Sequence, residues 1–81
     1  MNSQHRAIRA LLQSMAPKRA VYYIQSFELP PEEELFLIEC DVRRKSNIQA
    51  AIDNVTTPEV VKRRKRSAYH HISDQIQTEH I

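Results

Sequence analysis

The stretch that decides the fold of this chain runs from Ser46 to Ile72 and reads SNIQAAIDNVTTPEVVKRRKRSAYHHI. It predicts a short helix, a tight turn and a longer basic helix. Ser46 begins a capping box, in which its hydroxyl caps the amide of Gln49 and the Gln49 side chain reaches back. Asp53 and Asn54 end the short helix, and Asn54 is the candidate for the left-handed conformation that glycine usually takes after a helix.

The second helix of this stretch opens with three residues that favour a helix start. Thr57 is the expected N-cap, Pro58 occupies the first helical position, and Glu59 lies near the positive end of the helix dipole. The helix is expected to reach about Gln77, with fraying over residues 77–81. Apolar residues spaced seven and four apart define the side that faces the core: Val61, Ala68 and Ile72, flanked by Val60 and Tyr69.

That core side fixes which charged residues of the second helix point away from the protein. A helix-turn-helix protein uses such residues, in the first turns, to reach the base edges and phosphates of double-stranded DNA. Thr56 and Thr57 are expected to donate to phosphate from the helix start. Arg43, Arg44 and Lys45, at the end of the preceding helix, are expected to clamp a phosphate alongside. The predicted DNA-contacting residues on the outward side are Glu59, Lys62, Arg63, Arg66 and His70.

The chain before Ser46 predicts three further helices. The first covers about residues 2–16, and the second begins at Pro17, although one helix kinked at this proline is an alternative. The third follows Leu29-Pro30-Pro31 and is expected to be the hub of the core, with Glu32, Glu33 and Glu34 opposing its dipole. The expected buried faces are Ala7, Ile8, Leu11, Leu12 and Met15; then Ala20, Val21, Tyr23, Ile24 and Phe27; then Leu35, Phe36, Ile38, Cys40 and Val42; and, in the short helix, Ala50, Ala51 and Ile52.

Composition narrows the fold class and the setting. The 81 residues give room for one small domain, so a homodimer stays open, and the complete absence of glycine argues against strands joined by tight turns. The predicted fold is therefore all-α, a small bundle of four to five helices containing a helix-turn-helix. One cysteine, no membrane span of ~20 apolar residues and no signal peptide predict a cytoplasmic protein without membrane contact.

Enzymatic and metal-dependent functions are not expected. A chain without glycine has no glycine-rich phosphate loop, and Cys40 is expected to be a small buried hydrophobe rather than a nucleophile. The adjacent His70 and His71 point to different helix faces, and no cysteine or carboxylate stands at zinc-ligand spacing. We therefore expect neither a metal nor a cofactor.

Two motifs resemble a known family. The first motif is Leu29-Pro30-Pro31-Glu32-Glu33-Glu34, which is followed by an apolar helix and by Lys45-Ser46. The second motif is the run from Val60 to Ile72. They resemble region 4 of bacterial sigma-70-type factors, and still more the sigma-region-4-like regulators encoded by phages and prophages of Gram-positive bacteria. The resemblance implies a helix-turn-helix over residues 29–76 and a transcriptional regulator that binds DNA, with RNA polymerase as a further partner.

One position departs from that family. The family usually has a leucine three residues before the cap of the recognition helix, and here that position is Asn54, or Asp53 if Thr56 is the cap. Ile52 is expected to fill the role, in a turn one or two residues longer than usual.

Residues 1–28 have no counterpart in the family and are expected to form a helical packing or dimerisation segment, or a polymerase-binding surface. The alternative function is a helical protein-interaction module, in which the same basic helix meets an acidic partner such as RNA polymerase or a phage packaging protein. A further alternative is that the five consecutive cations at positions 62–66 are only a solvated surface.

Overall fold

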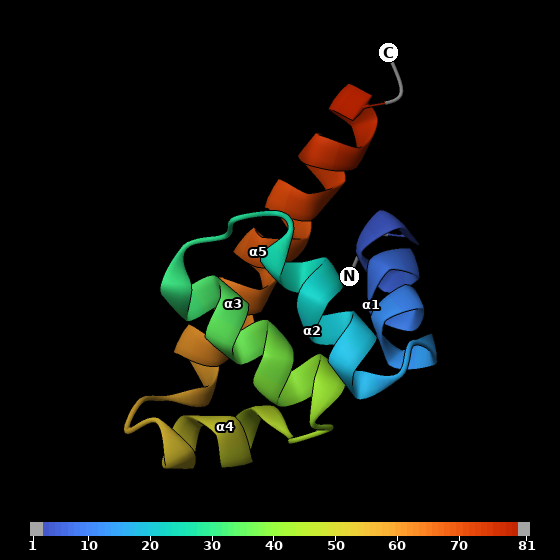
Figure 1. The fold of residues 1–81 in the computed structure, drawn as a ribbon. Helices are drawn as coiled ribbons and strands as arrows, with labels where there is room; N and C mark the ends of the chain where they lie inside the picture. The colour runs from blue at the N-terminus through green and yellow to red at the C-terminus, as the bar shows by residue number, and fades with distance from the viewer. Residues whose placement is uncertain (1–2, 80–81) are drawn as a thin grey trace.

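The structure is a computed structural model that describes residues 3–79. These residues form five α-helices, the third of which continues as a π-helical segment. The elements are α1 (Ser3–Ser14), α2 (Pro17–Gln25), α3 (Pro31–Leu37), η1 (Ile38–Val42), α4 (Asn47–Asp53) and α5 (Pro58–Glu79). The 22-residue α5 runs past the other helices, with α4 at one end of the molecule and the C-terminal turns of α5 at the other (Figure 1). The all-α prediction of four to five helices is confirmed.

The helix starts follow the caps and prolines in the sequence. Pro17 and Pro31 lie at the first positions of α2 and α3, and α1 ends before Pro17, so a single kinked helix is wrong. The Oγ of Ser46 accepts a hydrogen bond from the backbone N–H of Gln49 at 3.0 Å. The Oγ1 of Thr57 accepts one from the N–H of Val60 at 3.4 Å. At the other end, α5 continues through residue 79, beyond the expected end at 77, and residues 80–81 lie outside the described residues.

The left-handed turns fall on residues with a Cβ, because the chain has no glycine to place there. Glu28, Arg44 and Val55 have φ angles of 52°, 62° and 54°. The prediction for Asn54 is wrong, since its φ is −113°. Its side chain instead donates to the carbonyl of Ala50 at 2.8 Å, and this cap moves the left-handed residue one position along to Val55.

Two hydrophobic clusters hold the helices together. The larger joins α1, α2, α3 and α5, so the N-terminal segment supplies part of the main core. Its buried members are Ile8, Leu12, Ile24, Phe27, Leu29, Leu37, Ala68, Tyr69 and Ile72. The smaller lies between α3, η1, α4 and α5 and consists of Phe36, Cys40, Ala50, Ala51 and Val61. Its two alanines let the backbone of α4 approach closely, and this packing fixes α4 against the start of α5.

Two of the expected buried faces are rotated, in each case because a polar residue is buried. On α1 the buried stripe is His5, Ile8 and Leu12, with Leu11 exposed. The imidazole of His5 packs near the ring of Tyr69, with 5.6 Å between ring centroids. Ala7 on the same helix is also exposed, and Met15, directly after the helix ends, is half-buried.

On α3 and η1 the buried residues are Glu33, Phe36, Leu37, Glu39, Cys40 and Asp41. Leu35 is exposed, while Ile38 and Val42 are half-buried. In η1 the N–H of Arg43 bonds to the carbonyl of Ile38 at 2.9 Å, five residues back, which widens the helix. A hydrophobicity pattern with the α-helical period predicts neither this register nor the buried carboxylates.

Candidate nucleic-acid interface

The five consecutive cations of α5 divide between two environments. Lys62, Arg63 and Arg66 are exposed and have no ion-pair or hydrogen-bond partner among the described residues. Arg64 and Lys65 are half-buried: the Nε of Arg64 lies 2.8 Å from Glu32, and the Nζ of Lys65 donates to the Oδ1 of Asn47 at 3.0 Å. The run therefore has two parts. The outer row, which consists of Lys62, Arg63 and Arg66, is unpaired among the described residues, whereas Arg64 and Lys65 contact other side chains of the protein.

The other predicted contact residues of α5 and its start are positioned as follows. Glu59 and His70 are exposed on the same side as the outer row, as predicted, and the Nε2 of His70 lies 3.4 Å from Asp74. Thr57 is exposed with its Oγ1 engaged as the helix cap, and Thr56 is half-buried. The first turns of α5 thus present a mainly basic surface to solvent.

A groove of about 420 Å³ lies beside the outer row. It is bounded by α1, by the residues that lead into α4 and by α5. The lining residues are His5, Arg9, Cys40, Lys45, Ser46, Asn47, Lys62, Lys65, Arg66 and Tyr69. Six of these ten are basic residue types, and no carboxylate is among the described residues that line the groove. Sequence reasoning missed His5 and Arg9, because nothing in a linear pattern shows that α1 folds back against α5.

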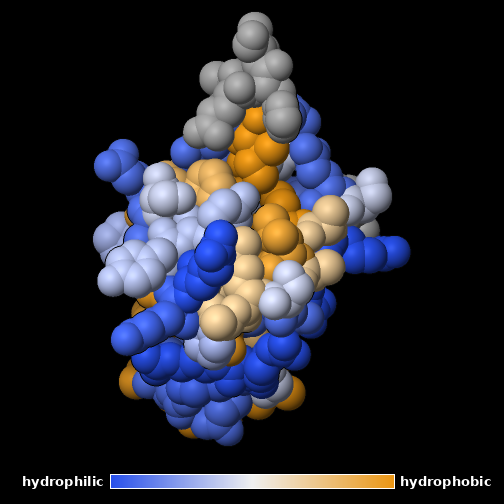
Figure 2. All heavy atoms as spheres, turned by 45° about the vertical axis from the view of Figure 1, so that its right-hand side comes forward, coloured by the Kyte–Doolittle hydropathy of each residue, from blue (hydrophilic) through white to orange (hydrophobic). Residues whose placement is uncertain are grey.

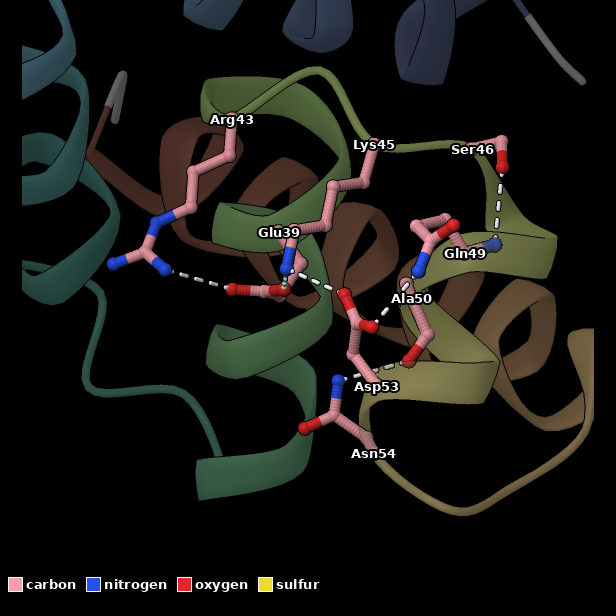
Figure 3. A network of polar contacts seen from close by, with 8 residues as sticks. All are labelled: Glu39, Arg43, Lys45, Ser46, Gln49, Ala50, Asp53 and Asn54. Carbon is pink, nitrogen blue, oxygen red and sulfur yellow. Dashed lines mark hydrogen bonds and ion pairs between the residues drawn. The ribbon is translucent and has the colours of Figure 1, made fainter.

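Lys45 is held in place by two carboxylates from different elements (Figure 3). Its Nζ donates to the buried Glu39 of η1 and, at 2.8 Å, to the Oδ2 of Asp53 on α4. Asp53 and Glu39 raise the pKa of Lys45, and Lys45 lowers the pKa of Asp53. Asp53 also accepts from the Nε2 of Gln49 at 2.8 Å, so the Gln49 side chain does not reach back to Ser46 and that half of the capping box is wrong.

The three residues predicted to contact a phosphate, Arg43, Arg44 and Lys45, each contact an acceptor within the protein. The Nη1 of Arg43 lies 3.2 Å from Glu39 (Figure 3), and the Nη2 of Arg44 donates to the carbonyl of Gln13 at 3.0 Å. Only Lys45 of the three lines the groove. The structure therefore brings Lys45 together with the cations of α5 and uses Arg44 to fasten the loop to α1.

A buried acid lies under the groove. Asp41 is 1% exposed and accepts a hydrogen bond from the hydroxyl of Tyr69. Its Oδ1 lies 3.9 Å from the Nε of Arg9 and has no hydrogen-bond partner. Burial raises the pKa of both the Asp41 carboxyl and the Tyr69 hydroxyl. This pair connects η1 to α5, and it places a negative charge behind the guanidinium of Arg9.

A second buried acid, Glu33, connects α3 to the middle of α5. Glu33 is 5% exposed, accepts from the Oγ of Ser67 at 3.0 Å and lies 2.7 Å from the Nδ1 of His71. The sequence accounts for Glu33 only as a charge at a helix N-terminus. Its partners lie more than 30 residues away along the chain, so no local pattern identifies this contact.

The remaining chemically notable residues have structural partners. Cys40 is buried, as expected, its Sγ donates to Asn47 at 3.7 Å, and burial raises the pKa of the thiol. Within residues 3–79, histidine, cysteine and acidic side chains form no group of three that would hold a metal ion. No helix in this part of the chain is long and apolar enough to cross a membrane.

Three apolar side chains of α4 and the following turn face solvent. Ile48, Ile52 and Val55 are 62%, 65% and 95% exposed. The expectation that Ile52 replaces the packed family leucine is therefore wrong, because Ala50 and Ala51 supply the contact with α5 and turn Ile52 outward. On the face drawn in Figure 2, hydrophilic side chains flank a hydrophobic band that runs from the upper part to the centre, and smaller hydrophobic groups lie at the lower edge.

Comparisons of the chain with protein-family models, with curated proteins and with solved structures gave no match.

Proposed function

We propose that this protein binds double-stranded DNA, with α4, residues 54–57 and α5 acting as a helix-turn-helix. By its resemblance to sigma-region-4-like proteins, it would serve as a transcriptional regulator of a phage or prophage. The observation that carries the proposal is the outer row of Lys62, Arg63 and Arg66, which is exposed and unpaired within residues 3–79. These side chains lie in the first three turns of a long helix, where recognition helices contact DNA.

The packing under the outer row supports this function. Val61 is fully buried against the smaller cluster, and the alanines of α4 press on the same side of α5. A helix held in this way presents its outward side chains in a fixed arrangement, which lowers the entropy cost of binding. Arginines in such a row can form two hydrogen bonds to guanine, worth about 1–3 kcal/mol of discrimination each.

The outer row also differs from several other surface cations of the protein, because it has no counter-charges among the described residues. In this protein Arg43, Arg64 and Lys45 lie on or near the surface, and each has a carboxylate partner. The outer row has none among the described residues. Three adjacent cations without counter-charges repel one another, and a polyanion removes that repulsion and releases its own counterions on binding.

The test is fluorescence anisotropy with labelled duplex DNA drawn from a random-sequence selection. Replacing Arg63 and Arg66 with alanine is expected to weaken binding at least about 10-fold and to remove sequence preference, because each bidentate contact is worth about 1–3 kcal/mol. The matched control is Lys18→Ala with Arg19→Ala, which removes the same charge from exposed positions on α2. It should leave the sequence preference intact. Failure of the intact protein to bind any duplex at low salt would exclude the proposal.

A protein-interaction module is the second candidate function. The specific observation in its favour is the exposed apolar row of Ile48, Ile52 and Val55 at the end of the molecule that carries α4. Exposed apolar residues grouped together mark contact sites more often than scattered ones. Purification from the native host with and without Ile48→Asp and Ile52→Asp tests it. A partner retained by the native sequence and lost in the variant supports this candidate, and recovery of no partner counts against it.

A further inference from the structure

We propose that the groove between α1, residues 45–47 and α5 binds a phosphodiester of the nucleic-acid backbone, which makes the N-terminal helix α1 part of the interface. This inference rests on the proposed DNA-binding function and deepens it. It assigns a ligand to His5, Arg9 and Lys65, none of which belongs to the outer row of α5.

The groove offers hydrogen-bond donors rather than acceptors. Arg9, Lys62, Lys65 and Arg66 carry only donors, and the Oδ1 of Asn47 already accepts from both Lys65 and Cys40. The amide NH₂ of Asn47 therefore remains to donate. A groove with many donors, positive charge and no lining carboxylate among the described residues favours an anion over a cation or a neutral ligand.

Three of the groove's cations, Lys45, Lys65 and Arg9, are held in place before any ligand binds. Lys45 is fixed by Glu39 and Asp53, Lys65 by Asn47, and Arg9 lies 3.9 Å from the buried Asp41. Side chains that are already ordered lose less conformational entropy when an anion arrives. Burial, and after it nearby charges that include His70 and Arg66, lower the pKa of the His5 imidazole.

The shape of the site favours an extended anion over a small one. Lys62 and Arg66 belong to both the groove and the outer row of α5, so the two surfaces are continuous. A DNA strand whose bases face the outer row can place a flanking phosphate in the groove. Phosphate contacts of this kind fix the register of a protein on DNA without reading its sequence.

The experiment measures duplex binding by anisotropy over a range of salt concentrations, using Arg9→Gln and Lys65→Gln. Each variant is expected to bind about 3–10-fold more weakly at low salt and to reduce the magnitude of the log–log salt slope by about one, with the preferred sequence unchanged. Lys18→Gln, on the exposed face of α2, is the matched control and should bind like the native protein. Thermal unfolding of each variant confirms that it is folded.

A second measurement separates the groove from the proposed function. Inorganic phosphate is added to the isotope-labelled protein, and amide chemical shifts are followed by NMR. Shifts at Ser46, Asn47 and Lys65 that disappear in Lys65→Gln support the groove as an anion site. Native affinity of both groove variants for duplex would overturn the inference while the proposed function stands. Phosphate binding without any duplex binding would overturn both the proposed function and the assignment of the groove to nucleic acid.

Discussion

Replacing Tyr69 with phenylalanine tests the contact that joins η1 to α5 beneath the groove. The Tyr69 hydroxyl is the hydrogen-bond donor to Asp41, a carboxylate 1% exposed whose other oxygen has no hydrogen-bond partner. Without the hydroxyl, the charge of Asp41 retains the guanidinium of Arg9, at 3.9 Å, and the nearby charges of Lys65 and Arg44. A hydrogen bond to a charged group contributes about 1.5–3 kcal/mol, so we expect the free energy of unfolding to fall by about 2 kcal/mol.

That loss is large enough to measure by thermal unfolding. For a domain of this size a change of 1 kcal/mol shifts Tm by roughly 4–8 °C, so Tyr69→Phe should lower Tm by roughly 8–16 °C in circular dichroism at neutral pH. The matched control is Tyr23→Phe. The Tyr23 hydroxyl, on the half-buried residue that packs against Phe27, has no hydrogen-bond partner within residues 3–79, and its loss should change Tm little.

The pH dependence gives the same prediction a second test. Burial raises the pKa of Asp41 above its value in the unfolded chain. Protonated Asp41 therefore favours the folded state, and this contribution to the free energy of unfolding is lost as pH rises from about 4 through the folded pKa. The hydrogen bond from Tyr69 opposes that rise in pKa. The destabilisation in Tyr69→Phe should therefore grow between about pH 4 and pH 7. A Tm no lower than that of Tyr23→Phe would refute the reasoning.

The remaining predictions concern strain, a second pH effect and the second buried acid. Val55→Gly should raise the free energy of unfolding by roughly 0.5–1 kcal/mol in a denaturation assay, because Val55 is 95% exposed and has a φ of 54°. The control is Ile48→Gly, inside α4, which should lower the free energy of unfolding in the same assay. The lowered pKa of His5, caused first by burial, predicts that stability declines as pH falls below about 6.5, and an NMR titration should find the His5 midpoint below that value. Glu33→Gln weakens the contact with His71 and should cost about 1–2 kcal/mol in thermal unfolding.

The helix starts can be predicted from the sequence because each depends on a local signal. Ser46 and Thr57 accept from amides three residues along, and Pro17 and Pro31 are tolerated only where no amide proton is needed. The outward direction of Lys62 and its neighbours is equally local, since the apolar residues of α5 fix its buried side. These signals suffice for the fold class and for the outer row of the candidate interface.

The parts that the sequence did not predict depend on contacts between distant residues. Glu33 and Asp41 are acidic residues of the central helix, yet each is buried because α5 supplies its partner, Ser67 and His71 for Glu33 and Tyr69 for Asp41. The groove is missed for the same reason, because Arg9 reaches α5 only after α1 packs against it. Helix α4 has two apolar faces, one with Ala50 and Ala51 and one with Ile52. Ile52 is exposed because the smaller cluster packs against the alanine face.

Duplex binding measured as a function of salt tests the central claim most directly. If about three to five cations of the outer row and the groove contact phosphates, the slope of log K against log salt should lie between about −2.7 and −4.5, from about 0.9 per phosphate contact. Affinity should then fall roughly 40- to 500-fold between about 50 and 200 mM salt. No duplex binding at low salt, or an affinity that does not change with salt, would contradict the account.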